Sequence, residues 1–457
     1  MWRRALDHLA YWKDRASRRP LVLRGARQVG KSTLVRLFAE QSFDHLVTID
    51  FERDPRDATL FASADPAALL PRLEVRAGAR IVPGRTLLFL DEVQAAPDAL
   101  RALRYLHEER PDLHVIAAGS LLDLTLAEAQ VPFPVGRVEF LHLGPMSLDE
   151  FLLGTGERSM AEWLGTLRPG DSLPEALHAR AMELLRAYLV IGGMPEVVAT
   201  WAKTRSLLEC ELVKQSLLST FEADFAKYGP RVDLRRLSKM FRAAPRFVGQ
   251  RFKYAHVDRD DRAAPLARAL DQLVAARVVH RVRASSGNGV PLAAEADDRR
   301  FKVLFLDVGL LGRALGLDLR EIDQADDVVA IHAGAIAEQH VGQHLLSARE
   351  PHEDPELYFW ARELRSSTAE VDYLTLDGTQ VIPVEVKSGV TGRLKSLHAF
   401  VREKGARLAV RLDRRPPSVT DAVTSLPDGH NVPFRLVSLP LYLAGHVGRI
   451  VREQAGL

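Results

Sequence analysis

Near its N-terminus the chain reads Gly25-Ala26-Arg27-Gln28-Val29-Gly30-Lys31-Ser32-Thr33. The apolar run Leu21-Val22-Leu23 precedes this loop, and a helix-forming segment follows it. The glycines let the backbone wrap around phosphates, so that N–H groups and the helix N-terminus face the negative charge. Strand, loop and helix in this order are the context that a P-loop requires. We therefore expect residues 25–33 to bind ATP, with Lys31 on the β- and γ-phosphates and the Ser32 hydroxyl on Mg²⁺.

A second acidic element supports the nucleotide site. The apolar run Leu87-Leu88-Phe89-Leu90 ends in Asp91-Glu92. We expect Asp91 to hold Mg²⁺ through water and Glu92 to polarise the attacking water. This pair favours hydrolysis over phosphoryl transfer to a small acceptor. The next expected strand ends at Gly119-Ser120, where Ser120 either touches the γ-phosphate or forms an ordinary turn.

Hydrolysis also benefits from an arginine that faces the transferred phosphoryl group. Arg137 is our candidate, acting on its own nucleotide or on that of a neighbouring chain. Arg101 and Arg104 are competing candidates, although a surface or structural role suits them better.

Composition limits the class of protein. The 457 residues suggest about three domains. Lys plus Arg (62) nearly balances Asp plus Glu (60), which excludes a polycation or an acidic-tail protein as a whole. The lone Cys210 excludes an internal disulfide framework, and no apolar run has the length of a membrane span, so we expect a cytoplasmic protein with no membrane partner. His340 and His344 lie one helical turn apart without a third ligand, and we expect them at the surface.

The pattern along the chain predicts an α/β protein of several parts. Alternating strands and helices predict a parallel sheet with helices on both faces in residues 1–153. A linker and a helical lid are expected in residues 154–230. Helix, helix, strand, polar loop and strand predict a winged-helix-like segment in residues 231–328. A final α+β unit is expected in residues 329–457.

Basic residues accompany phenylalanines in the winged-helix-like segment. They are Arg231, Arg235, Arg236, Lys239, Arg242, Arg246, Arg251 and Lys253, with Phe241, Phe247 and Phe252 among them. A duplex-binding helix would place such residues on phosphates, which makes DNA a candidate partner. A solvated basic face is an equal alternative, because Asp258, Asp260 and Asp261 follow directly.

A hairpin in the last unit gathers carboxylates. Residues 370–376 and 380–387 flank Asp377-Gly378, a type I′ turn signal. A two-residue turn there pairs Val371 with Val384 and makes Asp372 and Glu385 diagonal neighbours.

One face then carries Glu370, Asp372, Glu385 and Lys387. Asp372 and Glu385 would hold a second divalent metal, and with Lys387 beside them such a site can activate water against a phosphodiester. Glu338, on a preceding helix, would add a further carboxylate. The alternative is a solvated face with a Lys387–carboxylate salt bridge.

These motifs, in this order, resemble a group of bacterial and archaeal AAA-type ATPases that carry a C-terminal domain of unknown function related to PD-(D/E)xK nucleases. The loop at residues 25–32 matches the group's GARQVGKT apart from Ser32. Further matching segments are Leu90-Asp91-Glu92-Val93-Gln94, Gly192-Gly193-Met194-Pro195-Glu196, Phe305-Leu306-Asp307-Val308-Gly309-Leu310 and Gly334-Ala335-Ile336-Ala337-Glu338.

The resemblance implies an AAA-type core, a helical lid, a winged-helix-like segment and a nuclease-like end domain. In the nuclease superfamily's terms, Asp372, Glu385 and Lys387 match D…ExK, and Glu338 matches the helical glutamate.

Two hypotheses follow for the function. In the first, Mg-ATP hydrolysis controls a nucleic-acid-directed, nuclease-like domain within a homo-oligomer. In the second, the chain is an ATP-gated regulatory protein whose nuclease-like domain is a non-catalytic docking scaffold.

Overall fold

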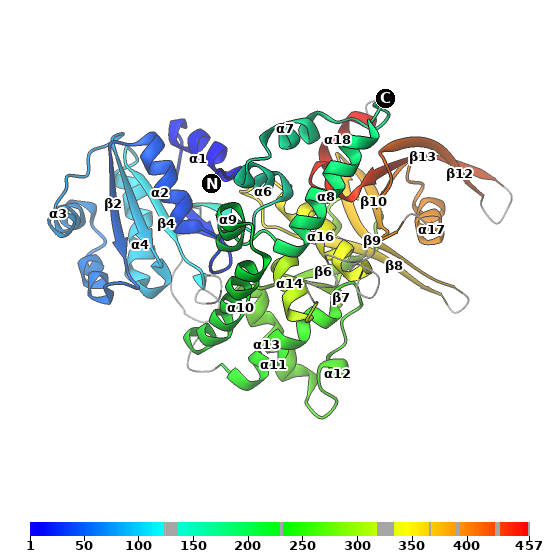
Figure 1. Ribbon diagram of the computed structural model, residues 1–457. Coiled ribbons are helices and arrows are strands. Elements are labelled where there is room, and N and C mark those ends of the chain that lie inside the picture. The colour runs from blue at the N-terminus through cyan, green and yellow to red at the C-terminus, as the bar shows by residue number, and fades with distance from the viewer. Residues whose placement is uncertain are drawn as a thin grey trace.

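The computed structural model has two sheets with a layer of helices between them (Figure 1). It describes residues 1–122, 124, 136–228, 232–317, 333–364, 367–389, 394–425 and 430–455. The N-terminal sheet lies on one side of the molecule, and the larger C-terminal sheet lies on the other.

The first sheet is parallel and has five strands in the order β2-β3-β4-β1-β5. They are β1 (Leu21–Arg24), β2 (His45–Asp50), β3 (Thr86–Asp91), β4 (His114–Ala118) and β5 (Glu139–His142). One face packs against α1 (Ala5–Asp14) and α2 (Lys31–Ser42), and the other packs against α3 (Pro66–Ala77) and α4 (Pro97–Glu109). The prediction of a parallel sheet with helices on both faces is confirmed.

A helical layer follows the first sheet. It consists of α6 (Leu148–Thr155), α7 (Arg158–Thr166), α8 (Glu175–Ile191), α9 (Pro195–Thr204) and α10 (Leu207–Asp224), and a short 3-10 turn (Phe225–Tyr228) continues α10. Ser147 and Glu150 form a capping box that starts α6. The chain turns between α8 and α9 at Gly193, where a Cβ atom would lie 2.1 Å from the Met146 carbonyl oxygen. The buried carboxylate of Asp307 fixes this turn by accepting the Gly193 N–H at 2.7 Å.

The expected winged-helix pattern is present as a sequence of elements. The helices are α11 (Leu234–Ala243), α12 (Tyr254–Val257) and α13 (Ala263–Ala275), and the strands are β6 (Val279–Ser285) and β7 (Ala296–Phe305). However, β6 also pairs in parallel with β8, so the β6–β7 hairpin is one end of the larger sheet. The expectation of a separate winged-helix unit missed this pairing, which satisfies the second backbone edge of β6.

The C-terminal sheet is mixed and has eight strands in the order β12-β13-β11-β10-β9-β8-β6-β7. Its remaining strands are β8 (Leu357–Leu364), β9 (Ser367–Asp377), β10 (Gln380–Val386), β11 (Leu408–Asp413), β12 (Ser418–Ser425) and β13 (Asn431–Pro440). The helices are α14 (Val308–Ala314), α16 (Ala333–Ser347), α17 (Lys395–Lys404) and α18 (Val447–Ala455). Because Val410 packs with the α16 side and Ala409 with the α17 side, these two helices cover opposite faces.

The register of the β9–β10 hairpin differs from our expectation by two residues. Val384 pairs with Tyr373 instead of Val371, and the connecting residues are Gly378 and Thr379. Gly378 has a φ of +55°, so the glycine takes the first turn position. A shift of two residues leaves side chains on their expected faces, and it brings Glu385 level with Asp372.

The expectation that His340 and His344 lie at the surface is wrong. Both are buried in α16, with ring centroids 4.2 Å apart. Nε2 of His344 accepts the Leu148 N–H at 2.8 Å, and Nδ1 donates to the His340 carbonyl at 2.9 Å. These bonds join the C-terminal sheet's helix to the start of α6.

Candidate nucleotide site and carboxylate centre

The phosphate loop joins β1 to α2 and has the backbone that its glycines predict. Gly25 and Gly30 have φ values of +153° and +91°. A Cβ atom on Gly25 would lie 2.1 Å from the Leu143 carbonyl oxygen, so only glycine fits there. Gly30 precedes the first residue of α2 without a side-chain cap, which leaves the helix N–H groups free for an anion.

Lys31 lies buried beneath this loop. Its ammonium donates to the carbonyls of Gly25 and Ala26, both at 2.9 Å. Burial lowers the pKa of Lys31 to about 8. Sequence reasoning missed Arg3, which contacts the same loop by donating a hydrogen bond to the Val29 carbonyl at 3.0 Å.

The expected magnesium ligands lie together. Asp91 ends β3, and the Ser32 side chain hydrogen-bonds to its carboxylate. Burial raises the pKa of Asp91, and the Ser32 bond opposes this shift. A hydroxyl and a carboxylate in contact are hard oxygen donors that suit Mg²⁺, so the residues present fit the ion.

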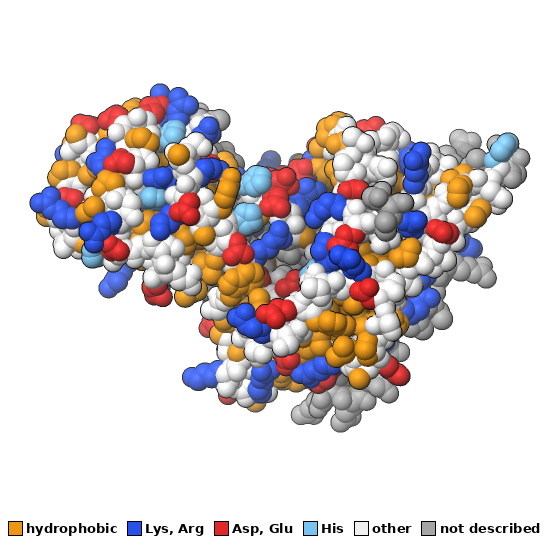
Figure 2. Space-filling model, turned by 90° about the horizontal axis from the view of Figure 1, so that it is seen from above, with side chains coloured by type: hydrophobic (Ala, Val, Ile, Leu, Met, Phe, Trp, Pro, Cys, Tyr) orange, Lys and Arg blue, Asp and Glu red, His pale blue; other side chains and the backbone are white. Residues whose placement is uncertain are grey.

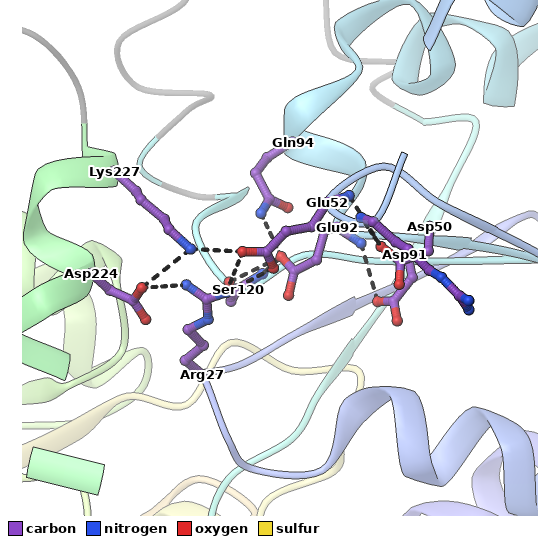
Figure 3. Close-up of polar contacts among 10 residues, drawn as sticks. Arg27, Asp50, Glu52, Asp91, Glu92, Gln94, Ser120, Asp224 and Lys227 are labelled. Atoms are coloured by element: carbon purple, nitrogen blue, oxygen red, sulfur yellow. Dashed lines mark hydrogen bonds and ion pairs between the residues drawn. The ribbon is translucent and has the colours of Figure 1, made fainter. Parts of the chain in front are cut away.

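Glu92 is hydrogen-bonded by two polar neighbours, Ser120 and Gln94 (Figure 3). Its Oε2 accepts the Ser120 hydroxyl at 3.1 Å, and it also accepts the Gln94 amide. Its φ of +52° is unusual for a residue with a Cβ atom and marks local backbone strain. The structure thus brings Ser120 to Glu92, a contact that the sequence analysis did not predict. Gln94 received no role from the sequence, although it stands two positions after Glu92.

A four-membered charge ring links the phosphate loop to α10 (Figure 3). Arg27 contacts Glu52 at 2.7 Å and Asp224, at the end of α10, at 2.7 Å. Lys227 closes the ring by contacting Glu52 at 2.6 Å and Asp224 at 3.4 Å. The ring was not predicted, because its members come from three separate segments.

The candidate arginine Arg137 lies far from the phosphate loop of its own chain. It contacts Glu108, near the C-terminal end of α4, at 2.7 Å. In the β1–β5 pairing, Leu21 stands beside Glu139, so Arg137 lies before the first residues of the sheet, whereas the phosphate loop follows the strand's last residue. In a parallel sheet, all strands begin at one end of the sheet and finish at the opposite end. Arg137 therefore lies at the opposite end of the strands from the phosphate loop of its own chain. The competing Arg101 and Arg104 make surface ion pairs along α4 with Asp98 and Glu108.

The C-terminal carboxylates come together around a lysine that the sequence analysis missed. Nζ of Lys302, in β7, lies 3.2 Å from Glu338, 2.7 Å from Glu370 and 3.4 Å from Asp372. Lys302 is only 3% exposed. The available signal was a single charge within the apolar run Phe301-Lys302-Val303-Leu304-Phe305.

Glu385 and Lys387 form the other part of this centre. They pair at 2.6 Å, and Asp372 accepts the Val386 N–H at 2.8 Å. Burial and the neighbouring Asp372 raise the pKa of Glu385 to about 7. Burial and Asp372 likewise raise the pKa of Glu338 to about 8. Within the described residues, no cluster of three metal-ligating side chains has the arrangement that a metal needs.

The basic residues expected to contact DNA are mostly paired with nearby acids. The pairs are Arg236 with Asp233 and Asp261, Lys239 with Asp258, Arg242 with Glu222, and Arg251 with Glu370. Arg231 lies outside the described residues. Phe241, Phe247 and Phe252 are buried core residues. Figure 2 shows acidic and basic side chains interspersed on the visible face, without one continuous basic patch.

Comparisons with known proteins agree with the N-terminal geometry. A family model described as an AAA domain matches residues 17–152. Two domains of unknown function, DUF8612 and DUF4143, match residues 182–321 and 333–427. A search of curated proteins finds no match.

The solved structures that match this chain are distant from it. The Aeropyrum pernix ORC2 protein is 13% identical, with coverage of 69% of this chain and 94% of that chain and a TM-score of 0.32. The S. cerevisiae Hsp104–ADP complex is 13% identical, with coverage of 60% and 38% and a TM-score of 0.27. The structure of Drosophila ORC bound to DNA is 15% identical, with coverage of 68% and 86% and a TM-score of 0.27.

No helix among the described residues is long and apolar enough to span a membrane. The phosphate loop, the Ser32–Asp91 contact and the five-stranded parallel sheet all lie within or beside the matched N-terminal region. The chain therefore contains an AAA-type P-loop ATPase domain, followed by two domains of unknown function.

Proposed function

We propose that the chain hydrolyses ATP at the phosphate loop and that hydrolysis changes how α10 contacts the nucleotide site. The observation that carries this proposal is the convergence of Lys31, the Ser32–Asp91 pair and the restrained Glu92 around one loop. Together they supply phosphate binding, oxygen ligands for a cation and a base.

Each residue has one task in this proposal. The loop N–H groups and Lys31 bind the phosphates and exclude bulk water from them. Ser32 and Asp91 would hold Mg²⁺, which when bound neutralises charge on the β- and γ-phosphates. Glu92 orients the attacking water and accepts its proton once it leaves Ser120 and Gln94. Arg137 completes the site of a neighbouring chain in a homo-oligomer.

The regulatory part of the proposal rests on the charge ring. Arg27 belongs to the phosphate loop, and Asp224 and Lys227 belong to the helical layer, so phosphate binding competes with Asp224 for Arg27. This competition supports the regulatory part of the second hypothesis, in which ATP gates the protein. The segments 1–153, 154–230, 231–328 and 329–457 remain our proposed division of the chain.

The test compares Lys31→Ala, Glu92→Gln and the exposed control Glu40→Gln in the full chain, with Mg²⁺ and with or without DNA. Lys31→Ala should bind ATP only weakly. Glu92→Gln should keep ATP binding and lose turnover by about 100-fold or more. Turnover at the wild-type rate in Glu92→Gln would contradict the assigned base, whereas stimulation by DNA would identify nucleic acid as a partner.

A further inference from the structure

The carboxylate centre of the C-terminal sheet already contains a cation of its own. Lys302 contacts three carboxylates, those of Glu338, Glu370 and Asp372, through one nitrogen. A carboxylate cluster with one shared cation at its centre is the arrangement expected around a bound divalent ion. Here the shared cation is an ammonium on a buried strand, placed where such an ion would make the same contacts.

The charges of the centre are nearly balanced without any added ion. Glu338, Glu370, Asp372 and Glu385 supply four carboxylates. Lys302, Lys387 and Arg251 each make an ion pair with one or more of them. Burial alone would lower the pKa of Lys302, but the neighbouring carboxylates raise it above its ordinary value, so Lys302 keeps its charge. A divalent ion would have to enter beside this ammonium and overcome its repulsion.

The centre is also covered by the segment that precedes α12. Val248 and Arg251 form β-bridges to Val303 and Lys302, so this segment runs alongside β7. A Cβ atom on Gly249 would lie 3.3 Å from Oε1 of Glu338, which shows how closely the cover approaches the carboxylate. Glu385 is 4% exposed and Lys302 is 3% exposed. The cover and the burial shield the shared nitrogen, whereas the side chains of Glu370 and Asp372 stay 27% and 14% exposed.

We infer that Lys302 takes the place of a divalent cation, so that the centre is an ion-pair cluster joining β7 to α16 and β9. The residues that match a nuclease pattern therefore do not fit a metal in this chain. The cluster instead fastens the segment containing β7 to the domain that follows. This inference is independent of ATP hydrolysis at the phosphate loop.

The test measures Mn²⁺ binding by electron paramagnetic resonance in the full chain without nucleotide. The variants are Lys302→Ala, Asp372→Asn and the double variant. Wild type and Asp372→Asn should bind the same number of ions. Lys302→Ala should gain one Mn²⁺ per chain, and the double variant should lose it. Lys387→Ala is the matched control, because it removes a more exposed lysine of the same centre and should gain none.

Two results would overturn the inference. One is a wild-type Mn²⁺ site that disappears in Asp372→Asn, and the other is a folded Lys302→Ala that gains no ion. If Lys302→Ala does not fold, the comparison of Mn²⁺ binding between wild type and Asp372→Asn still tests the inference. Equal binding supports it, and the loss of one ion in Asp372→Asn overturns it. Mn²⁺-dependent DNA cleavage that needs Asp372 would also overturn it, whatever the ATPase result.

Discussion

Lys31 shows how burial adjusts a binding residue before its ligand arrives. Its ammonium donates to two backbone carbonyls, and burial lowers its pKa to about 8. Bound phosphates would raise this pKa again, because they are nearby negative charges.

The first prediction concerns the pH dependence of ATP binding. ATP binding favours protonated Lys31. The contribution of Lys31 to ATP affinity is therefore complete below its pKa of about 8, and it is lost as the pH rises through the higher pKa that Lys31 has with ATP bound. The Kd for a fluorescent ATP analogue should therefore increase above about pH 8. Lys31→Ala should bind weakly with no such change, and an unchanged wild-type Kd up to pH 9.5 would contradict the assignment.

His344 gives a second prediction, for stability in acid. Burial lowers its pKa to about 4, and protonation would place a proton on Nε2, which already accepts the Leu148 N–H. Because the pKa of His344 is lower in the folded protein than in the unfolded chain, neutral His344 contributes fully to stability above pH 6.5. This contribution is lost as the pH falls from 6.5 towards 4. The loss is at most about 3 kcal/mol.

Urea unfolding at pH 7 and pH 5 measures this effect. His344→Gln keeps an acceptor near Leu148 without a titrating group, so its free energy of unfolding should fall less between the two pH values than that of wild type. Equal losses in both proteins would assign the acid sensitivity to other groups, such as the partly buried His280, whose pKa is also lowered.

At the scale of single residues, the sequence predicted a phosphate loop between a strand and a helix, which the structure contains, and only part of the carboxylate centre. The phosphate loop is a contiguous motif, so its chemistry can be found without a structure. Lys302 lies 36 residues from Glu338 and 70 from Asp372, and only folding brings them together. The same separation hid the contact between Arg27 and Asp224.

Among the secondary-structure elements, α10 connects the helical layer to the nucleotide site. Its Asp224 holds Arg27 of the phosphate loop and is nearly buried. A carboxylate at this place repels phosphates and competes for the arginine, so it opposes ATP binding.

The third prediction follows from that competition. Asp224→Asn should tighten ATP binding by about fivefold, the effect of roughly 1 kcal/mol for a partly exposed pair. Glu222→Gln is the control, because Glu222 lies on the same helix but pairs with Arg242 instead. A weaker affinity in Asp224→Asn would show that the α10 contact supports the nucleotide-binding conformation.

Strand patterns were predicted more reliably than strand partners. The alternation in β9 and β10 identified a hairpin, but its turn begins one residue later than the Asp-Gly signal suggested. The pairing of β6 with β8 leaves no local signal, since 71 residues lie between Ser285, the last residue of β6, and Leu357, the first residue of β8. Both differences arise because sheet register depends on packing across distant segments.

For the whole molecule, a prediction about assembly follows from the position of Arg137, at the end of the first sheet opposite the phosphate loop. If it serves a neighbouring chain, Arg137→Ala and Glu92→Gln should each be inactive alone and regain part of the turnover when mixed. Each neighbour then supplies what the other lacks.

Arg101→Ala is the control for this mixing assay, because Arg101 is also exposed but pairs with Asp98 on the same helix. Full activity of Arg137→Ala alone, or no recovery in mixtures shown by light scattering to contain joint assemblies, would contradict a shared site.

The eight-stranded sheet has a consequence for how this protein can vary through evolution. Two matched domains, residues 182–321 and 333–427, contribute strands to one hydrogen-bonded sheet. A recombination event between them would leave β8 with a bare apolar edge, which invites aggregation. The two segments are therefore expected to be inherited as one cassette, whereas the AAA domain, with a complete sheet of its own, is free to be exchanged.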